Sequence, residues 1–226
     1  MQGPRWRNST QGWKSPRPND KEGKEVLTEK VVSEKLPRGT GKPRLRGLSL
    51  AEMESLLAGN GFEPFRGRQL FHWVFRKGAR SLEEMKNLPK ALREWLAENT
   101  ELGGVQEAAS LTQSGDGSYK FLFRLDDGRK VESVLMPDPV RNYWTQCLSS
   151  QVGCAVDCKF CVTGFNGFIR QMRVDEIVDQ VLFARRHLLE QNPEANYRNL
   201  VYMGMGEPLL NAKAVIDSIR LLTHEQ

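Results

Sequence analysis

The sequence predicts an α/β fold with parallel strands, preceded by a small helical domain and a β-hairpin. Apolar residues recur at helical spacing between residues 48 and 96, and they alternate with polar residues between 119 and 136. From residue 144 to 222, strand-like and helix-like segments follow one another in turn. Such alternation is typical of parallel sheets whose crossover connections are right-handed.

The chain has the composition of a globular protein with a basic tail. Its 226 residues include 33 Lys and Arg, 28 Asp and Glu, and 39% hydrophobic residues. The basic surplus lies in residues 1–47, which are rich in Gly, Pro and charge, so we expect a disordered tail there. This tail would act as a solubilising leader or as an arm that attracts RNA phosphates. No apolar run approaches the roughly 20 residues that span a bilayer, so no membrane partner is expected.

Residues 48–104 are predicted to form a helical accessory domain. Ser49 and Glu52 form a capping box for a first helix, which Gly59 can end. The spacing of apolar residues predicts a second helix over 66–77, and a short third helix follows. Pro89 suits the first turn of a fourth helix.

Residues 105–142 are predicted to form a β-hairpin and a linker. Residues 119–125 alternate between aromatic or aliphatic and more polar side chains, and residues 131–136 can return as the partner strand. The Asp127-Gly128 pair between them is typical of a tight turn.

Residues 143–226 are predicted to form the α/β core. Strands are expected over Trp144–Ser150 and Asn199–Met203, followed by helices over Val174–Glu190 and Ala212–Leu222. The loops after both strands would meet beyond the carboxyl ends of the sheet, where α/β folds bind ligands. One is a cysteine loop, residues 154–161, and the other is a glycine-rich loop, residues 204–208.

The cysteine loop contains Cys154, Cys158 and Cys161 at Cx3Cx2C spacing. Three thiolates can hold three irons of a four-iron cluster and leave the fourth iron for another ligand. A structural zinc site would use four ligands, but only Cys147 and three scattered histidines remain. A disulfide is a weaker alternative, since no signal peptide marks the chain as secreted.

Three segments resemble the RlmN family of radical S-adenosylmethionine (SAM) RNA methyltransferases. They are Cys147–Cys154, the Cx3Cx2C motif and Met203–Asn211, and the resemblance extends from about Leu48 to Gln226. The Pro64-Phe65-Arg66 and Lys90–Arg93 segments resemble the family's accessory domain. This resemblance implies that residues 143–226 are the N-terminal part of a radical SAM partial (β/α)6 TIM-like barrel, here incomplete.

The resemblance also implies cofactors and substrates. A [4Fe-4S] cluster would be bound by Cys154, Cys158 and Cys161, and SAM by Gly206 and Glu207. The reaction would be methylation of carbon 2 of an adenine in 23S rRNA and tRNA. Phe160 would pack against the SAM adenine or shield the cluster; ordinary loop packing is the alternative.

Two further residues match functional positions of the family. Cys147 matches the cysteine that forms a disulfide bond with a methyl-carrying cysteine, although a buried strand thiol is an alternative. Glu132 matches the proton acceptor, and its alternative is an exposed strand glutamate. The loop between Met136 and Cys147 is longer than the family pattern, which affects the register of Glu132.

Cys161 is the last cysteine of the sequence, so the methyl-carrying cysteine is absent from it. We therefore expect an N-terminal fragment without methyl transfer on its own. The parent enzyme would be a cytoplasmic monomer that receives electrons from a reductant protein such as flavodoxin or ferredoxin. Alternatives are a related adenine carbon-8 rRNA methyltransferase, another radical SAM enzyme such as a glycyl-radical activase, and a non-catalytic iron-sulfur or RNA-binding fragment.

Overall fold

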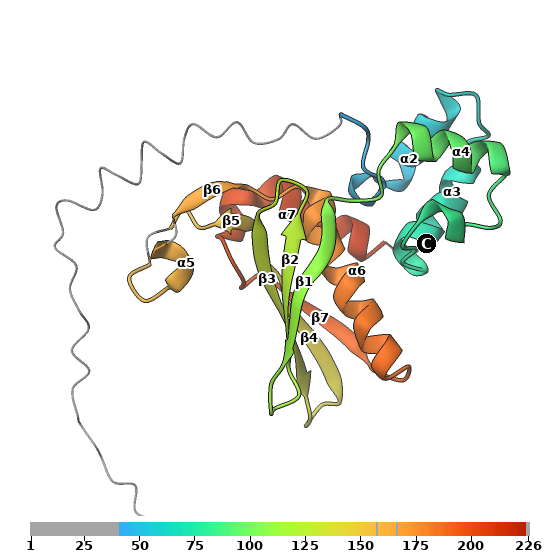
Figure 1. Cartoon of the computed structure of the whole chain (residues 1–226). Coiled ribbons are helices and arrows are strands. Elements are labelled where there is room, and N and C mark those ends of the chain that lie inside the picture. Colours follow the sequence, from blue (N-terminus) through green and yellow to red (C-terminus); the bar gives the residue numbers. More distant parts are fainter. Residues whose placement is uncertain (1–40, 157, 166, 225–226) are drawn as a thin grey trace, which may run out of the picture. The chain divides into compact units, whose positions relative to one another are not determined.

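A mixed five-stranded sheet forms the centre of the protein (Figure 1). The computed structural model describes residues 41–156, 158–165 and 167–224, so the expected tail over residues 1–40 lies outside the described residues. The strand order is β1-β2-β3-β4-β7, and β5 and β6 form a separate two-stranded ribbon. The strands are β1 (Val105–Gln113), β2 (Tyr119–Leu125), β3 (Lys130–Asp138), β4 (Tyr143–Cys147), β5 (Gln151–Gly153), β6 (Phe168–Gln171) and β7 (Tyr197–Val201).

The predicted accessory helices are present. Helix α2 (Leu50–Ala58) begins at the predicted capping box, in which Ser49 and Glu52 each accept the other's backbone N–H. Helix α3 (Arg66–Phe71) continues into a π-helical turn over His72–Arg76, and a 3-10 turn covers Leu82–Glu84. Helix α4 (Lys90–Asn99) begins directly after Pro89. The apolar residues at helical spacing in the second helix, which include Leu70, Phe71 and Val74, are buried, as the pattern predicts.

The expectation that disorder extends to residue 47 is wrong for its last residues. A 3-10 turn covers Leu45–Gly47, and Leu45 is fully buried in the accessory core. Arg44 donates to Glu101 (2.9 Å), and Arg46 donates to the buried Asp179 (2.6 Å). These two basic residues were grouped with the tail because of their charge, but the partly exposed carboxylate of Glu101 and the buried carboxylate of Asp179 hold them in the fold.

The predicted hairpin is the β2–β3 pair, but it belongs to a larger antiparallel meander. Strand β1 pairs with β2, and β3 pairs with β4. Strand β4 pairs in parallel with β7, as the strand–helix–strand order predicts. The crossover between them contains α6 (Val174–Gln191), and β7 leads to α7 (Ala212–Leu222).

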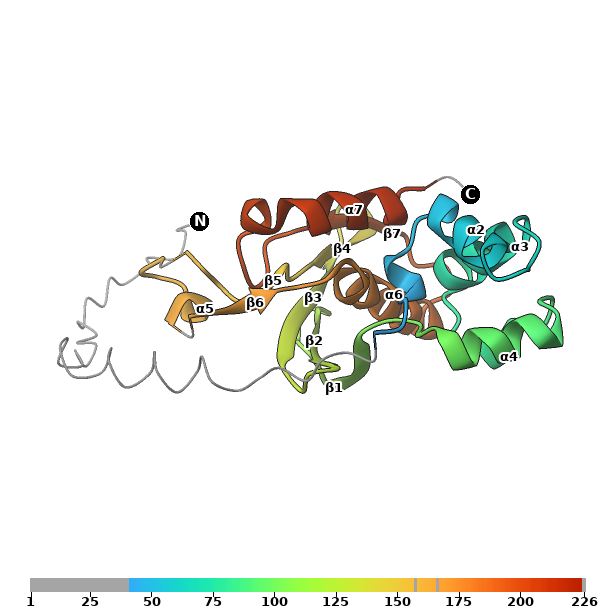
Figure 2. The same ribbon diagram turned by 90° about the horizontal axis from the view of Figure 1, so that it is seen from above.

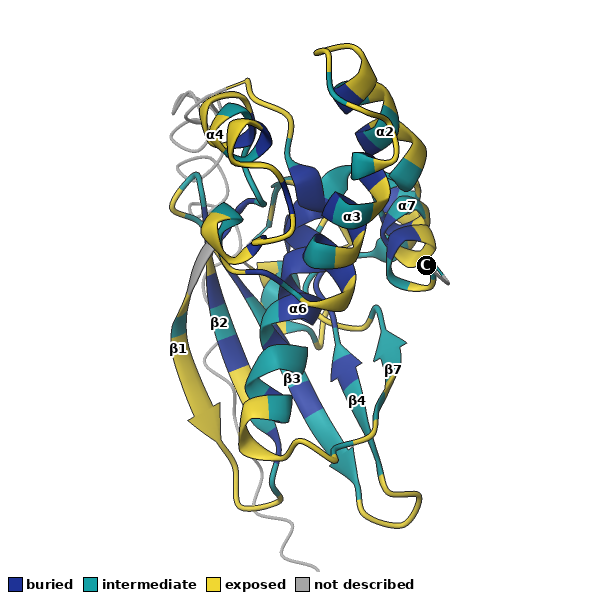
Figure 3. Cartoon of the chain, turned by 90° about the vertical axis from the view of Figure 1, so that its right-hand side faces the viewer, coloured by how far each residue is buried: buried dark blue, intermediate teal, exposed yellow. Residues whose placement is uncertain are grey.

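Helix α6 covers one face of the sheet (Figures 2 and 3). Its apolar residues Ile177, Val181 and Ala184 share a core with Phe123 and Leu135 of the sheet. The neighbouring side of α6 adds Val178 and Leu182 to the accessory core, so one helix belongs to both cores. Among the described residues, no helix has the length and apolar character needed to cross a membrane.

Candidate metal centre and glycine-rich loop

The cysteine loop is the tip of a β-hairpin formed by β5 and β6. Cys154 follows β5 directly, and its N–H donates to the carbonyl of Gly167 (3.0 Å), just before β6. Gly153 adopts φ +76°, and a Cβ there would lie 2.0 Å from the Gly167 oxygen. Glycine is therefore required at this point of the hairpin. The ribbon projects from the sheet, with the short helix α5 (Val162–Phe165) at its tip (Figures 1 and 2).

The three cysteines of this loop are free, partly buried thiols. The Val156 N–H points to the Cys154 sulfur (3.4 Å), and N–H groups of Gly164 and Thr163 hold the pKa of the Cys161 thiol below its usual value. Amide donors of this kind stabilise thiolates and tune iron-sulfur clusters. The donor chemistry thus fits a cluster, although among the described residues no three His, Cys, Asp or Glu are arranged closely enough to hold a metal ion.

Phe160 does not pack within the loop. Its side chain is 91% exposed, so the ordinary loop-packing alternative does not describe it. Val162 and Phe165 beside it are also exposed. The tip of the hairpin is therefore an apolar surface next to the thiols.

The glycine-rich loop lies against the chain segment that leads into the cysteine hairpin. The N–H of Gly204 donates to the Leu148 carbonyl (2.9 Å). The Met205 N–H donates to Ser149 Oγ (2.9 Å), and the Met205 carbonyl accepts the Ser150 N–H (2.8 Å). The glycine-rich loop is thus joined directly by hydrogen bonds to residues 148–150, at the base of the hairpin that carries the cysteine loop.

Both glycines of this loop approach that segment more closely than any other residue could. A Cβ at Gly204 would lie 2.7 Å from the Leu148 oxygen. Gly206 has φ +96°, and a Cβ there would lie 2.5 Å from Gln151 Cβ. The glycines are needed for contact with the protein's own backbone, in addition to any approach of a ligand.

Glu132 and Cys147 lie on the sheet face opposite α6. Cys147 pairs with Val134, two residues beyond Glu132 on the same face, whereas Val131 and Ser133 point to the buried side. Glu132 pairs electrostatically with Lys120 on β2 (2.8 Å), and both side chains are about half exposed. Burial raises the pKa of the Cys147 thiol, and the Met203 N–H opposes this only in part.

Ser149 connects this face to the glycine-rich loop. It is fully buried, and its hydroxyl donates to the Glu132 carbonyl (2.6 Å) while accepting the Met205 N–H. Gln180 of α6 binds both the N–H and the carbonyl of Ser149 (3.0 Å each). Glu132, the end of β4 and the glycine-rich loop therefore meet around one residue.

Sequence reasoning missed the ion pairs that hold the second strand of the hairpin. Arg170 on β6 binds Asp127 (2.7 Å) in the β2–β3 turn and makes a two-pronged contact with Glu176 (2.8 Å each), which is fully buried on α6. Asp127 was identified only as a turn residue. Its partner lies 43 residues away, and no local pattern indicates such a pair.

The Arg170–Asp127 pair predicts a pH-dependent contribution to stability. Burial raises the pKa of Asp127, but the hydrogen bonds from Arg170 and the Arg129 N–H outweigh burial, so the pKa is lowered overall. In the unfolded chain the pKa of an aspartate is about 3.9. The pair therefore stabilises the fold above about pH 4, and this stabilisation is lost as pH falls through the lower folded-state pKa.

Asp127→Asn is therefore expected to lower the free energy of unfolding at pH 7, with a difference from wild type that narrows below about pH 4. Urea denaturation at several pH values measures this. Asp116→Asn is the matched control, because Asp116 is also a turn aspartate but accepts its hydrogen bonds from Ser118 and, within the described part of the chain, from no arginine. A pH-independent difference for Asp127→Asn would contradict the assignment.

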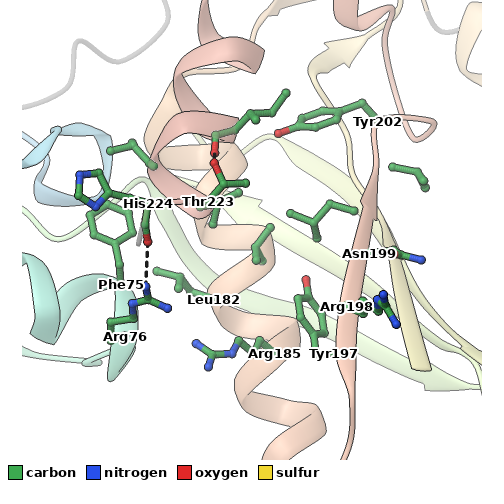
Figure 4. Close-up of a pocket in the computed structure, with 16 residues that line it drawn as sticks. Phe75, Arg76, Leu182, Arg185, Tyr197, Arg198, Asn199, Tyr202, Thr223 and His224 are labelled. Atoms are coloured by element: carbon green, nitrogen blue, oxygen red, sulfur yellow. Dashed lines mark hydrogen bonds between the residues drawn. The ribbon is translucent and has the colours of Figure 1, made fainter. Parts of the chain in front are cut away.

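A separate pocket of about 680 Å³ lies away from these residues (Figure 4). It is bounded by the π-helical turn, α6, β7 and α7, and Arg76 donates to the His224 carbonyl at one side (2.9 Å). It contains none of the site residues predicted from the sequence. The candidate site is instead the junction of the cysteine hairpin, the glycine-rich loop and the open sheet face.

Comparison with known proteins finds similar sequences and one similar solved structure. Residues 44–102 match the family model described as the ribosomal RNA large subunit methyltransferase N-terminal domain. The dual-specificity RNA methyltransferase RlmN of Anaeromyxobacter dehalogenans is 47% identical over 186 residues, which are 81% of this chain and 49% of that protein. RlmN of Geobacter sulfurreducens is 45% identical over 181 residues, 80% of this chain and 48% of that protein.

A crystal structure of a radical SAM methyltransferase from Sphaerobacter thermophilus matches with a TM-score of 0.76 and 41% identity, covering 81% of this chain and 52% of that one. The chain thus spans about half the length of the relatives it matches. The sequence identities, the matching N-terminal domain and the similar fold all indicate the same family. The chain belongs to the RlmN family.

Proposed function

We propose that this chain forms the cluster-binding and SAM-binding part of a radical SAM RNA methyltransferase that acts on carbon 2 of adenine in 23S rRNA and tRNA. The observation that supports this most directly is the set of hydrogen bonds between the glycine-rich loop and the base of the three-cysteine hairpin. The relatives' names, dual-specificity RNA methyltransferase, support the reaction class and the substrate class.

In this proposal Cys154, Cys158 and Cys161 hold a [4Fe-4S] cluster. With SAM, the cluster supplies carbon-radical chemistry, which an electrophilic aromatic carbon requires. The amide donors around Cys154 and Cys161 would stabilise their thiolates. The exposed Phe160 is available to cover the SAM adenine or the cluster.

Gly206 and Glu207 would hold the amino group of SAM. Glu207 Oε1 accepts the Leu209 N–H (3.0 Å), which fixes the carboxylate at the start of a 3-10 turn over Pro208–Asn211. A fixed carboxylate is a strong acceptor for an ammonium group. Gly206 keeps the backbone of the loop close to the hairpin.

Glu132 and Cys147 are proposed as proton acceptor and as partner thiol. Lys120 binds the Glu132 carboxylate (2.8 Å) and holds it on the sheet face that also carries Cys147, where a general base would have to reach the substrate proton. The raised pKa of Cys147 keeps it as a thiol, so a disulfide with a methyl-carrying cysteine would require its deprotonation first. Within the described residues all four cysteines are free.

The remaining assignments follow the family. We propose a cytoplasmic monomer that receives electrons from a flavodoxin or ferredoxin. The basic residues 1–40 would increase the rate of encounter with RNA through salt-sensitive attraction to phosphates.

Anaerobic iron-sulfur reconstitution of the 226-residue chain tests the proposal. We expect about four irons per chain and a spectrum that changes on addition of SAM. Cys158→Ala is expected to lose the cluster, whereas Cys147→Ala is expected to retain it, because Cys147 lies on the sheet rather than in the cysteine loop. Iron analysis and electron paramagnetic resonance measure both.

Two outcomes would contradict the proposal. Binding of zinc in place of iron, or a cluster whose spectrum does not change when SAM is added, would favour a non-catalytic metal-binding protein. For the reaction itself, mapping the RNA carbon that the parent enzyme modifies distinguishes carbon 2 from the carbon-8 alternative, since the chain alone is expected to transfer no methyl group.

A further inference from the structure

Gln151 joins the cysteine hairpin to the glycine-rich loop through its side chain. It is the first residue of β5 and is fully buried. Its amide oxygen accepts the N–H of Glu207 (3.0 Å), and its amide nitrogen donates to Gln171 Oε1 on β6 (3.0 Å). Its own N–H reaches the Met205 carbonyl (3.2 Å). One side chain thus binds the partner strand of the hairpin and the loop at the same time.

The glycine-rich loop packs closely on the Gln151 side chain. A Cβ built on Gly206 would lie 2.5 Å from Gln151 Cβ and 2.7 Å from its Cγ. The loop backbone therefore rests directly on the Gln151 side chain. A change in the shape or polarity of this side chain would move the loop or remove the acceptor of the Glu207 N–H.

Asn211 provides a second connection at the same base. Its amide nitrogen donates to the carbonyls of Ser150 and Met172, both at 2.8 Å, and these residues flank the hairpin on its two sides. Gln171 extends the same network, since its amide nitrogen donates to the Leu210 carbonyl (2.9 Å). Three side-chain amides thus link both strands of the hairpin to the loop and to the turn that follows it.

We propose that Gln151 is a positioning residue that sets the glycine-rich loop, and the Glu207 amide in particular, at a fixed distance from the three-cysteine loop, so that one SAM molecule is held by both loops at once. This rests on the proposed function, in which the cysteine loop holds the cluster and the glycine-rich loop holds the SAM amino group. Gln151 itself would touch neither SAM nor iron.

Hydrogen–deuterium exchange on the chain without cluster tests the positioning directly. In Gln151→Leu, which keeps the size but loses both side-chain hydrogen bonds, the Glu207 amide should exchange about tenfold faster. In Gln151→Glu, which keeps an acceptor oxygen, exchange at Glu207 should stay close to wild type. Gln171→Glu is the matched control, because it keeps the acceptor for Gln151 and loses only the donor to Leu210.

Reconstituted protein supplies the second measurement. Gln151→Leu should retain the wild-type iron content and raise the SAM concentration for half-maximal spectral change by about tenfold, and Gln151→Glu should restore most of the response. Unchanged Glu207 exchange in Gln151→Leu would overturn the proposal. Loss of iron together with SAM response would also overturn it, since Gln151 would then be a general structural residue.

The two proposals fail in different ways. If wild-type protein binds no SAM-sensitive cluster, the proposed function fails, while exchange at Glu207 still decides whether Gln151 positions the loop. If wild-type protein responds to SAM and Gln151→Leu responds equally, only the positioning role fails.

Discussion

Gly206→Ala is expected to lower the free energy of unfolding by about 2–5 kcal/mol and to abolish the SAM-dependent spectral change. The left-handed backbone at Gly206 (φ +96°) accounts for about 1–2 kcal/mol in any residue with a Cβ. The Cβ would also overlap Gln151, whose Cβ and backbone nitrogen lie 2.5 and 2.7 Å away, which adds about 1–3 kcal/mol of overpacking. Urea denaturation and SAM titration of the reconstituted protein measure the two effects.

Gly128→Ala is the matched control for this prediction. Gly128 also has a positive φ (+79°), but a Cβ there would meet nothing within 4 Å. This variant should show only the backbone effect of about 1–2 kcal/mol, with an unchanged SAM response. An equal decrease in the free energy of unfolding in both variants would show that contact with Gln151 is unimportant. Only the backbone conformation would then require glycine at residue 206.

Elements with strong local signals were predicted closely. Helix α7 has the predicted bounds, α6 ends one residue beyond the prediction, and α2 begins at the predicted capping box. Each has a clear apolar period or a cap, so the local sequence and the tertiary fold favour the same structure. The parallel pairing of β4 and β7 followed from the order of elements alone.

Strands without a local signal were missed. Strand β1, with the sequence VQEAASLTQ, has small and polar residues on both faces, and it exists because β2 offers a free edge for pairing. Strands β5 and β6 have three and four residues, too short to show a period. Their pairing closes the cysteine loop. The hydrophobic pattern therefore did not predict the hairpin that carries the three cysteines.

The sequence predicted the residues proposed to bind the cluster and SAM, but not the residues that hold those two loops in place. The cysteine spacing and the glycine-rich segment are contiguous motifs, so both could be identified from residue types. Gln151, Ser149 and Arg170 each bind at least one partner 31 to 56 residues away, a separation that only the folded chain bridges. Buried polar residues inside an apolar strand were the available signal, since such groups require partners.

Asp179→Ala is expected to lower the free energy of unfolding by about 3–5 kcal/mol, because it leaves the buried Arg46 without its counter-charge. Arg46 is 4% exposed and Asp179 is fully buried, and they bind at 2.6 Å. The other carboxylate oxygen of Asp179 accepts the Val105 N–H (2.9 Å) at the start of β1. Asp179 of α6 therefore joins the accessory domain to the sheet. Its replacement by alanine should remove both the ion pair with Arg46 and the hydrogen bond from Val105. Urea denaturation measures the change.

The exposed pair Lys90–Glu94 on α4 provides the comparison. Its side chains are 82% and 62% exposed, and Glu94→Ala should change stability by no more than about 0.5 kcal/mol. The double variant Arg46→Met with Asp179→Leu should recover part of the loss, since no unpaired charge stays buried. The single variants Arg46→Met and Asp179→Leu complete the comparison. If the double variant lowers the free energy of unfolding by the sum of the two single decreases, Arg46 and Asp179 are not coupled. Recovery would show that the cost of Asp179→Ala comes mainly from stranding the Arg46 charge, and that the pair fixes how the accessory helices meet α6 more than it adds net stability.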